Sequence, residues 1–389
     1  MRILISTSPG VGHLLPLLPV ARAARDRGHE VRIAAGASLA PIIAAAGFEH
    51  EPAGPATLGE VLQGIPELAG LTGRRRAVIT FRQAFCGAIA TGIADDILAL
   101  ADRWRPDVIV HEDLELGSWV VAERLGIPHA TIQATAWRPR MRDLAGEPLN
   151  KLRARHGLAP DAELERLYGA VFFTTRPPSL RDPNAPLPNG VAELRPIADD
   201  RHAGAEEADT GAATDPFPPA DGRPRIAITL GTVSMGQRDI LRTVIEGVAA
   251  TGAHVVVAGA DPATLEALPA NVTVRAYVPM STLLPAADLV AFHGGSGTML
   301  AALAAACPMV IVPLAADQPD NADLCVAAGV ARALPAEDLT AMAVRETMEA
   351  ILADPSYARR AGEIAAEVAA MPGPDAAVER MEAVVQSRS

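Results

Sequence analysis

Five residues near the start of the chain, Arg2-Ile3-Leu4-Ile5-Ser6, have a counterpart much further along it, at Arg225-Ile226-Ala227-Ile228-Thr229. Each is a short, mostly apolar run followed by a glycine-containing loop, a helical segment and a second apolar run. The two helices are predicted to end near Gly28 and Gly252, because glycine suits the left-handed position after a helix. A strand–helix–strand rhythm that occurs twice predicts two Rossmann-like α/β domains with parallel sheets.

The rest of the chain fits around these two units. We expect an N-terminal domain over 1–198, a linker over 199–224, a C-terminal domain over 225–370, and a last helix over 371–389 that can pack back on the first domain. The linker is predicted from its carboxylates and prolines, which leave almost nothing apolar to bury, and it would act as a hinge.

Further strands are expected in both domains, at 107–111, 128–133, 272–276, 289–292 and 309–312. Two stretches of the first domain, Pro55–Arg76 and Ala134–Pro148, match no strand–helix rhythm and are predicted to be irregular insertions. Insertions of this kind on a rigid α/β scaffold often carry specificity for small molecules.

Charge and cysteine content exclude several classes of function. With 34 basic and 46 acidic side chains the chain has a net charge of −12, so nucleic acid and anionic membranes are not expected partners. Cys86, Cys307 and Cys325 are far apart and lack CxxC spacing, which favours a reducing cytoplasm over a disulfide framework or a zinc site. The uncharged run Leu289–Ala316 is interrupted by glycines and prolines, so we expect strand–helix–strand there and no membrane span.

The loop after the first strand, Ser8-Pro9-Gly10-Val11-Gly12-His13, superficially suggests a dinucleotide-binding fingerprint. Leu15 stands where the third glycine belongs, and no acidic residue closes the second strand, so a nicotinamide site is disfavoured. The loop does place His13 in the first turn of a helix, where the helix dipole opposes protonation and keeps an imidazole neutral. His13 is a candidate general base, with a helix-capping role as the alternative.

A catalytic base needs an acceptor for its other ring nitrogen. Glu112 and Asp113 follow the apolar run Val108-Ile109-Val110, at the end of a predicted strand. The carboxyl ends of parallel strands line one crevice, so either carboxylate can lie near the loop of His13. Solvated carboxylates at a loop mouth are the alternative.

The second domain contains an anion-binding pattern, Phe292-His293-Gly294-Gly295-Ser296-Gly297-Thr298, which leads directly into a predicted helix. The glycines let the backbone approach a ligand, the helix amides favour an anion, and the His293 and Thr298 side chains add donors. This combination predicts a diphosphate site that needs no lysine or arginine. An esterase is disfavoured because the chain has no GxSxG elbow, and a P-loop is absent because the only lysine is Lys151.

Taken together, the histidine after the first strand, a Val-Pro pair at 278–279, the His-Gly-Gly-Ser-Gly-Thr loop and an Asp-Gln pair at 317–318 form a recognisable set. It resembles the bacterial glycosyltransferases of GT-B fold that attach nucleotide-activated sugars to polyketides, enediynes, macrolides and other natural products. The likeness spans both domains. It implies two Rossmann-like domains whose parallel sheets face each other across a cleft.

The resemblance also implies roles for individual residues. His13 would deprotonate the acceptor hydroxyl, with Glu112 in the place of the family's acidic partner; because that partner is more often Asp, Asp113 is an alternative. The implied donor-binding residues, from the nucleotide base to the sugar, are Gly231, Thr232, Tyr277, Val278, His293, Gly295, Ser296, Gly297, Thr298, Asp317 and Gln318. Two of these residues have alternative roles that stay open: Tyr277 can be an aromatic residue of the core, and Asp317 can be a helix N-cap. Phe81, Phe85 and Trp137 are candidate walls for the acceptor, although core packing suits each of them too.

The function implied is an inverting transfer of a sugar from a UDP- or TDP-sugar to a hydroxyl of a small natural product, in antibiotic or other secondary metabolism. No cofactor and no metal are expected, since the sequence has no DxD motif. The expected partners are the donor and a small aglycone, and a homodimer is left open. A C-glycosyltransferase acting on an aromatic polyketide, a nucleotide-sugar epimerase and a non-catalytic partner of another transferase are the alternatives.

Overall fold

The structure is a computed structural model that describes residues 1–71, 73–136, 141–182, 184–185, 187–188, 190–200, 215–230, 238–265 and 268–387. The chain forms two compact units, each of which is described by itself. Unit 1 consists of Met1–Thr175, Asp182–Arg195 and Met371–Ser389. Unit 2 consists of Arg176–Arg181 and Pro196–Ala370.

Unit 1 is built on a 7-stranded parallel sheet in the order β3-β2-β1-β4-β5-β6-β7. Its strands are β1 (Arg2–Ser6), β2 (Glu30–Ala35), β3 (Glu49–Pro52), β4 (Val108–Glu112), β5 (His129–Ile132), β6 (Val171–Thr174) and β7 (Val191–Glu193). Alternate residues of β1 enter different cores: Leu4 belongs to one apolar cluster, and Ile3 and Ile5 belong to another. Both faces of the sheet are therefore covered, as its mostly buried central strands β1, β4, β5 and β6 require.

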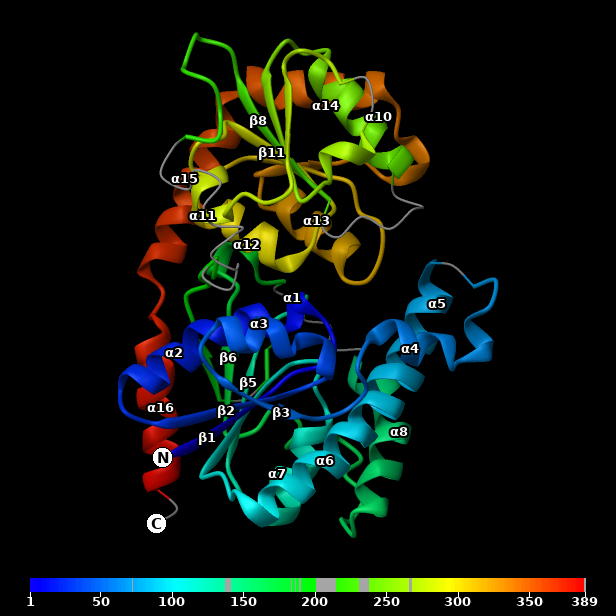
Figure 1. The fold of residues 1–389 in the computed structure, drawn as a ribbon, viewed down its shortest axis with the longest axis vertical. Coiled ribbons are helices and arrows are strands. Elements are labelled where there is room, and N and C mark those ends of the chain that lie inside the picture. Colours follow the sequence, from blue (N-terminus) through cyan, green and yellow to red (C-terminus); the bar gives the residue numbers. More distant parts are fainter. Residues whose placement is uncertain are drawn as a thin grey trace. The chain divides into compact units, whose positions relative to one another are not determined.

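Helices cover the two faces of this sheet (Figure 1). The helical segments of unit 1 are α1 (Val11–Leu14), η1 (Leu15–Leu17), α2 (Leu18–Asp26), η2 (Ala37–Leu39), α3 (Ala40–Ala45), α4 (Leu58–Gln63), η3 (Pro66–Leu68), α5 (Gly73–Ile79), η4 (Thr80–Ile89), α6 (Ala90–Arg103), α7 (Gly117–Leu125), α8 (Met141–Arg155) and α16 (Pro374–Gln386). Helices α2 and α3 pack with Ile3 and Ile5, whereas α6 and α7 pack with Leu4. The segment η4 is a π-helix.

The expectation of irregular structure in Pro55–Arg76 and Ala134–Pro148 was wrong for much of both stretches. The first contains α4, η3 and the start of α5, and the second contains the first half of α8. A local signal for α4 was present in the sequence: Thr57 accepts a hydrogen bond from the backbone N–H of Glu60, as expected at a helix N-terminus. Helix α8 contains Pro148, although proline is unfavourable inside a helix.

One helical stretch among the described residues, Arg75–Arg103, is long and apolar enough by length and composition to cross a membrane. Of its most apolar window, 56% is buried inside the protein, and buried core helices commonly meet the same criterion. The run Leu289–Ala316, which the sequence suggested testing as a span, forms a strand, a helix and a strand.

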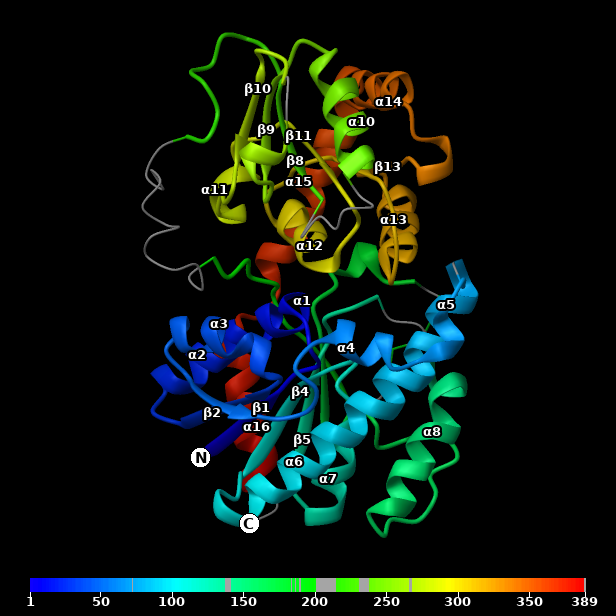
Figure 2. The ribbon, with the colours of Figure 1, turned by 45° about the vertical axis from the view of Figure 1, so that its right-hand side comes forward.

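Unit 2 repeats the architecture with a 6-stranded parallel sheet in the order β10-β9-β8-β11-β12-β13. The strands are β8 (Arg225–Thr229), β9 (His254–Ala258), β10 (Val272–Arg275), β11 (Leu289–Phe292), β12 (Met309–Ile311) and β13 (Ala331–Ala333). The helical segments are η5 (Pro178–Leu180), α10 (Arg238–Ala249), η7 (Pro262–Thr264), α11 (Met280–Leu283), α12 (Ser296–Ala304), α13 (Gln318–Ala327), η8 (Ala336–Asp338), α14 (Ala341–Ala353) and α15 (Pro355–Ala370). Helices α12 and α15 share one core, and α10 and α14 share the other (Figure 2).

Each sheet reverses its strand order beside its first strand. In unit 1, β1 lies between β2 and β4; in unit 2, β8 lies between β9 and β11. The loops that leave the carboxyl ends of such a strand pair diverge and open a crevice, which is where open α/β sheets bind ligands. A ligand site is therefore expected beyond Ser6 and His111 in unit 1, and beyond Thr229 and Phe292 in unit 2.

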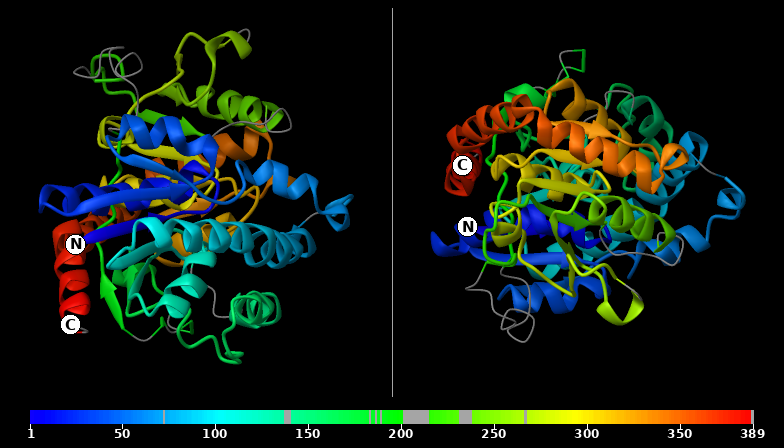
Figure 3. Two further views of the ribbon diagram at one scale, coloured as in Figure 1. Left: turned by 60° about the horizontal axis from the view of Figure 1, so that its bottom comes forward. Right: turned by 90° about the horizontal axis from the view of Figure 1, so that it is seen from above.

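The end of the chain belongs to unit 1. Helix α16 packs on α2, and the Glu382 carboxylate accepts a hydrogen bond from His29 at 2.8 Å. Strand β1 and helix α16, drawn in blue and red in Figure 3, accordingly both belong to this unit.

Candidate active site

His13 is held at the carboxyl end of β1 by a glycine turn. Gly10 has φ of +149°, which favours glycine, and a Cβ at this position would lie only 3.1 Å from Cδ2 of His13. The chain then enters α1, where the His13 side chain remains 18% exposed. An imidazole in this position is accessible to a substrate but fixed by its surroundings.

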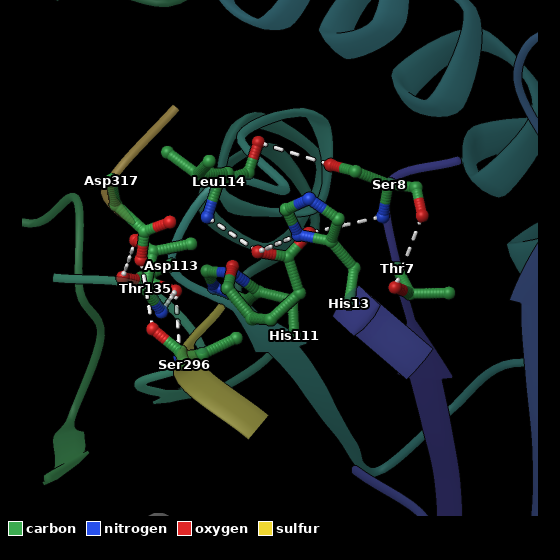
Figure 4. A network of polar contacts seen from close by, with 11 residues as sticks. Thr7, Ser8, His13, His111, Asp113, Leu114, Thr135, Ser296 and Asp317 are labelled. Atoms are coloured by element: carbon green, nitrogen blue, oxygen red, sulfur yellow. Dashed lines mark hydrogen bonds and ion pairs between the residues drawn. The ribbon is translucent and has the colours of Figure 1, made fainter. Parts of the chain in front are cut away.

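Glu112, the last residue of β4, faces His13. Its carboxylate is fully buried, and Oε2 lies 3.3 Å from Nδ1 of His13. The backbone N–H groups of Ser8 and Leu114 donate to the same carboxylate at 3.1 and 2.6 Å (Figure 4). Burial alone would raise the pKa of Glu112, but the charge and hydrogen bond of His13 together with the two backbone donors lower it below its ordinary value. Glu112 is thus ionised and lies within ion-pair distance of Nδ1, so Nε2 is the ring nitrogen of His13 that does not face this carboxylate.

Asp113 has a different role. Its carboxylate accepts hydrogen bonds from the backbone N–H of Ala134 at 2.8 Å and from the N–H and hydroxyl of Thr135 at 3.2 and 2.7 Å. Burial and the neighbouring charge of Glu112 raise the pKa of Asp113 to about 6. Of the two carboxylates left open by the sequence, the structure places Glu112 against His13 and uses Asp113 to anchor the loop after β5.

Aromatic side chains adjoin the histidine. The Phe85 ring, from the π-helix η4, lies 5.9 Å from the His13 ring at an interplanar angle of 43°. Phe81 comes from the same segment, and both rings are largely buried. π-Helical segments are rare and frequently occur at functional sites, so Phe85 suits an acceptor wall while also packing in the core. Trp137 lies outside the described residues.

In unit 2 the loop from β11 into α12 is shaped by its glycines. Gly294 has φ of +88°, and a Cβ there would lie 3.1 Å from Gln318. Gly297 has nothing within 4 Å of an added Cβ, so the start of α12 is open at that point. The first backbone N–H groups of a helix have no partner inside it, and those of Ser296, Gly297 and Thr298 are therefore suited to an anion.

His293 lies at the start of this loop, packed against Gly295. A Cβ on Gly295 would lie 2.6 Å from Nε2 of His293, so only glycine leaves the ring in place. Burial lowers the pKa of His293, and it outweighs the opposing effects of a hydrogen bond with the Thr229 backbone and of the Asp317 charge. The ring is therefore neutral near pH 7 and can act as a hydrogen-bond donor to phosphate oxygen.

The hydroxyl of Ser296 is the centre of a buried network. It accepts hydrogen bonds from Nη2 of Arg176 at 2.8 Å and from Nδ2 of Asn321 at 3.1 Å, and it donates to Oδ2 of Asp317 at 2.8 Å. A hydroxyl has one donor and two acceptor positions, so all three are occupied. Ser296, predicted as a ligand-binding residue, offers a ligand its backbone N–H, whereas its side chain fixes the loop.

Arg176 and Asn321 were missed by the sequence reasoning. Arg176 is 120 residues away from Ser296 in the chain, and no local pattern pairs the two. Asn321 was detectable in principle, because it follows the Asp-Gln pair by one helical turn and so shares a face of α13 with Asp317.

The Asp-Gln pair is engaged in the same region. Asp317 occupies the N-cap position of α13, yet its side chain makes no capping hydrogen bond and bonds Ser296 instead. Oε1 of Gln318 accepts from the backbone N–H groups of Leu314 and Ala315 at 2.7 and 2.8 Å. A contact between Gln318 and a sugar would therefore come from its amino group.

The remaining predicted donor residues are Tyr277, Val278, Gly231 and Thr232. Tyr277 is half-buried, and its hydroxyl donates to the backbone oxygen of Asp200 at 3.4 Å. Val278 is in the core, so it can present only backbone groups. Gly231 and Thr232 lie outside the described residues.

Comparison with solved structures identifies the class of protein that this fold and site define. The glycosyltransferase SsfS6 of Streptomyces sp. SF2575, in complex with thymidine diphosphate, matches with a TM-score of 0.79 at 28% identity, covering 98% of this chain and 99% of that one. The glycosyltransferase SnogD of Streptomyces nogalater matches with a TM-score of 0.77 at 30% identity, covering 99% of both chains. The protein is a glycosyltransferase of GT-B fold that uses a nucleotide-sugar donor and an acceptor substrate.

Family models for the erythromycin biosynthesis protein CIII-like N-terminal and C-terminal domains match residues 22–165 and 242–384. The chain belongs to this family. A curated relative, the elloramycin glycosyltransferase ElmGT of Streptomyces olivaceus, is 31% identical over 96% of this chain and 95% of its own. The 4'-demethylrebeccamycin synthase of Lentzea aerocolonigenes is 28% identical over 99% of each chain.

Proposed function

We propose that the protein transfers a sugar from a TDP-sugar to a hydroxyl of a small natural product, with inversion at the anomeric carbon, in the biosynthesis of an antibiotic or related metabolite. The observation that carries the proposal is the pair of His13 and Glu112 at the switch point of unit 1. The names of relatives support the setting, among them a tylactone mycaminosyltransferase of Streptomyces fradiae and a TDP-daunosamine transferase of Streptomyces peucetius.

Unit 1 supplies the base. The Glu112 carboxylate, 3.3 Å from Nδ1 of His13, favours the tautomer that carries its proton on Nδ1, and Nε2 then takes the proton of the acceptor hydroxyl. The oxygen forms a bond to C1 of the sugar as the bond between C1 and the diphosphate oxygen breaks. Attack comes from the face opposite the leaving group, which inverts the configuration. The proton stays on Nε2, and the resulting imidazolium is stabilised by the Glu112 carboxylate.

Unit 2 supplies the donor site. The leaving diphosphate takes the electron pair of the broken bond, and the amides at the start of α12 with the neutral His293 stabilise its charge. Backbone groups of Val278 are suited to the edge of a pyrimidine, with the Tyr277 ring next to it. Asp317 and the Gln318 amino group are assigned to sugar hydroxyls.

The domain roles follow from this assignment, whereas the compartment is inferred from the cysteines. Unit 1 is assigned to the acceptor and unit 2 to the donor. They correspond to the expected domains 1–198 and 225–370, except that Arg176–Arg181 and 196–198 belong to unit 2, as do the described parts of the expected linker 199–224. Residues 201–214 of that linker lie outside the described residues. All three cysteines, Cys86, Cys307 and Cys325, are free and buried, which supports a reducing cytoplasm.

A panel of nucleotides tests the donor assignment. Isothermal titration calorimetry with TDP, UDP, GDP and ADP should show tightest binding for TDP, and the same nucleotide should raise the melting temperature most. Absence of binding by every nucleoside diphosphate would contradict the proposal. Proton NMR of the product from an α-configured donor should show a β-linkage; a retained α-linkage would refute inversion.

A further inference from the structure

Arg176 is a buried arginine directly beneath the loop assigned to the diphosphate. It is the first residue of unit 2, immediately after the segment that contains β6, and it is only 3% exposed. Nη2 donates to Oγ of Ser296 at 2.8 Å and to Oδ1 of Asn321 at 3.0 Å, and Nη1 lies 3.2 Å from Sδ of Met299. Both Ser296 and Met299 belong to the first turns of α12.

These contacts determine the geometry of the loop. Asn321, which accepts from Arg176, donates to the backbone oxygen of Gly294 at 2.8 Å. The guanidinium therefore reaches both ends of the glycine turn: Gly294 through Asn321, and Ser296 directly. A planar guanidinium with several donors in fixed directions can hold two acceptors at once, whereas an ammonium group cannot reproduce this fork.

Arg176 also changes the charge of the site. The loop 293–298 carries no cationic side chain, since His293 is neutral, and the carboxylate of Asp317 is one hydrogen bond away from it. An uncompensated carboxylate next to a diphosphate is repulsive, especially where burial keeps the effective dielectric low. The guanidinium bonds the same hydroxyl as Asp317, so its charge offsets that of the carboxylate (Figure 4 shows the Ser296–Asp317 contact).

We propose that Arg176 is a positioning residue for the donor diphosphate: it fixes the turn from Gly294 to Ser296 through hydrogen bonds and supplies the positive charge that the loop lacks. The inference deepens the proposed function and depends on it, because it takes the loop as the diphosphate site. It differs from the sequence-based expectation that this site needs no arginine.

The test compares TDP with TMP, which has one phosphate fewer. Their dissociation constants are measured by calorimetry for the wild type, Arg176→Lys and Arg176→Gln. Arg153→Lys serves as the control, since Arg153 is also 3% exposed but bonds Glu123 in unit 1. Loss of hydrogen bonds to a charged group predicts that both Arg176 variants weaken TDP binding about tenfold and TMP binding much less. The control should leave the ratio of the two constants unchanged.

The outcomes separate the inference from the proposed function. If the wild type binds no TDP, both are overturned. If the wild type binds TDP and the Arg176 variants keep its preference for TDP over TMP, only the inference is overturned. A general loss of packing would weaken both nucleotides alike and so would not change the ratio.

Ser296→Ala provides a second route should the Arg176 variants fail to fold. It removes the hydroxyl that links the guanidinium to the loop without removing a buried charge. We expect a similar selective loss of TDP affinity, and TDP affinity equal to that of the wild type would overturn the inference. Where both variants fold, Arg176→Gln should cost less TDP affinity in the Ser296→Ala background than in the wild type, because one of the two routes from Arg176 to the loop is already lost there.

Discussion

Nδ1 of His13 lies 3.3 Å from Oε2 of Glu112, whose carboxylate is fully buried and held by the backbone N–H groups of Ser8 and Leu114. The histidine follows β1 and the glutamate ends β4, and these are the two strands at which the sheet order of unit 1 reverses. The pair of His13 and Glu112, called the dyad below, therefore depends on strand order, which brings together residues about a hundred positions apart in the chain.

Glu112→Gln should lower kcat by about 10²–10⁴-fold, because an amide at this position no longer fixes the tautomer of His13 or stabilises the imidazolium. TDP affinity should not change. Glu382→Gln is a matched control, since Glu382 bonds His29 at 2.8 Å in the same unit and far from the dyad. Steady-state kinetics of both variants measure kcat. Equal kcat values for Glu112→Gln and Glu382→Gln would contradict the role of Glu112 as the partner of His13.

The raised pKa of Asp113 leads us to expect that the free energy of unfolding depends on pH. This pKa is raised from 3.8 to about 6 in the folded state, so folding favours the protonated form. The stability that this group contributes is present at low pH and is lost as pH rises from about 4 to about 6. The lowered pKa of Glu112 has the opposite effect on the pH dependence of stability. The contribution of Asp113 must therefore be measured by comparing the wild type with a variant that lacks only this carboxyl group.

Asp113→Asn provides that comparison, because an amide can still accept from the N–H groups of Ala134 and Thr135. Urea denaturation from pH 4 to pH 8 should show the wild type losing stability relative to Asp113→Asn between pH 4 and pH 6. The difference should then stay constant above pH 7. A difference that is flat across the whole range would contradict the raised pKa.

The substitution Gly297→Ala should affect ligand binding without destabilising the fold. An added Cβ meets nothing within 4 Å, so Gly297→Ala should fold at least as well as the wild type, but its methyl group would occupy the space in front of the α12 amides. We expect TDP binding to weaken about tenfold, the loss of roughly one charge-assisted hydrogen bond. Gly362→Ala, in α15 and equally open, is the control for the helix effect. Calorimetry decides, and unchanged TDP affinity in Gly297→Ala would place the diphosphate elsewhere.

The substitution Phe85→Leu tests whether the Phe85 ring forms part of the acceptor-binding wall. Phe85→Leu keeps an apolar side chain in the core but removes the ring next to His13. KM for the acceptor should rise several-fold, while the TDP-sugar KM and affinity for TDP stay the same. Phe48→Leu, a similarly buried phenylalanine on the other core of unit 1, controls for packing. Identical acceptor KM values in the two variants would assign Phe85 to the core alone.

Much of the fold could be predicted from the sequence, because its parallel strands are buried on both faces and so appear as apolar runs. The strands around β1, β2, β4 and β5, and most of those in unit 2, were found this way. β3 was missed since its sequence, Glu49-His50-Glu51-Pro52, is polar and edge-like, and its pairing with β2 is stabilised by Arg32 contacting Glu51. Helix α4 and the start of α5 were missed because they lie in a stretch, Pro55–Arg76, that matches no strand–helix rhythm.

The candidate site was predictable where one local pattern contained it. The turn at His13 and the loop from His293 to Thr298 are continuous in sequence, and each adjoins a strand end. Which carboxylate meets His13 could not be read from the chain, because consecutive residues at a strand end point in opposite directions and register decides between them. The use of the Ser296 hydroxyl and the presence of Arg176 depend on contacts over long chain separations, which no local pattern encodes.

The role of His13 as the base is tested most directly with His13→Ala. Single-turnover transfer from the TDP-sugar and TDP affinity by calorimetry are determined on the same preparation, with His29→Ala as the histidine control. Transfer by His13→Ala should fall by at least about 10³-fold, with a TDP dissociation constant within about twofold of the wild type. Transfer close to the wild-type rate in His13→Ala would contradict the assignment of His13 as the base.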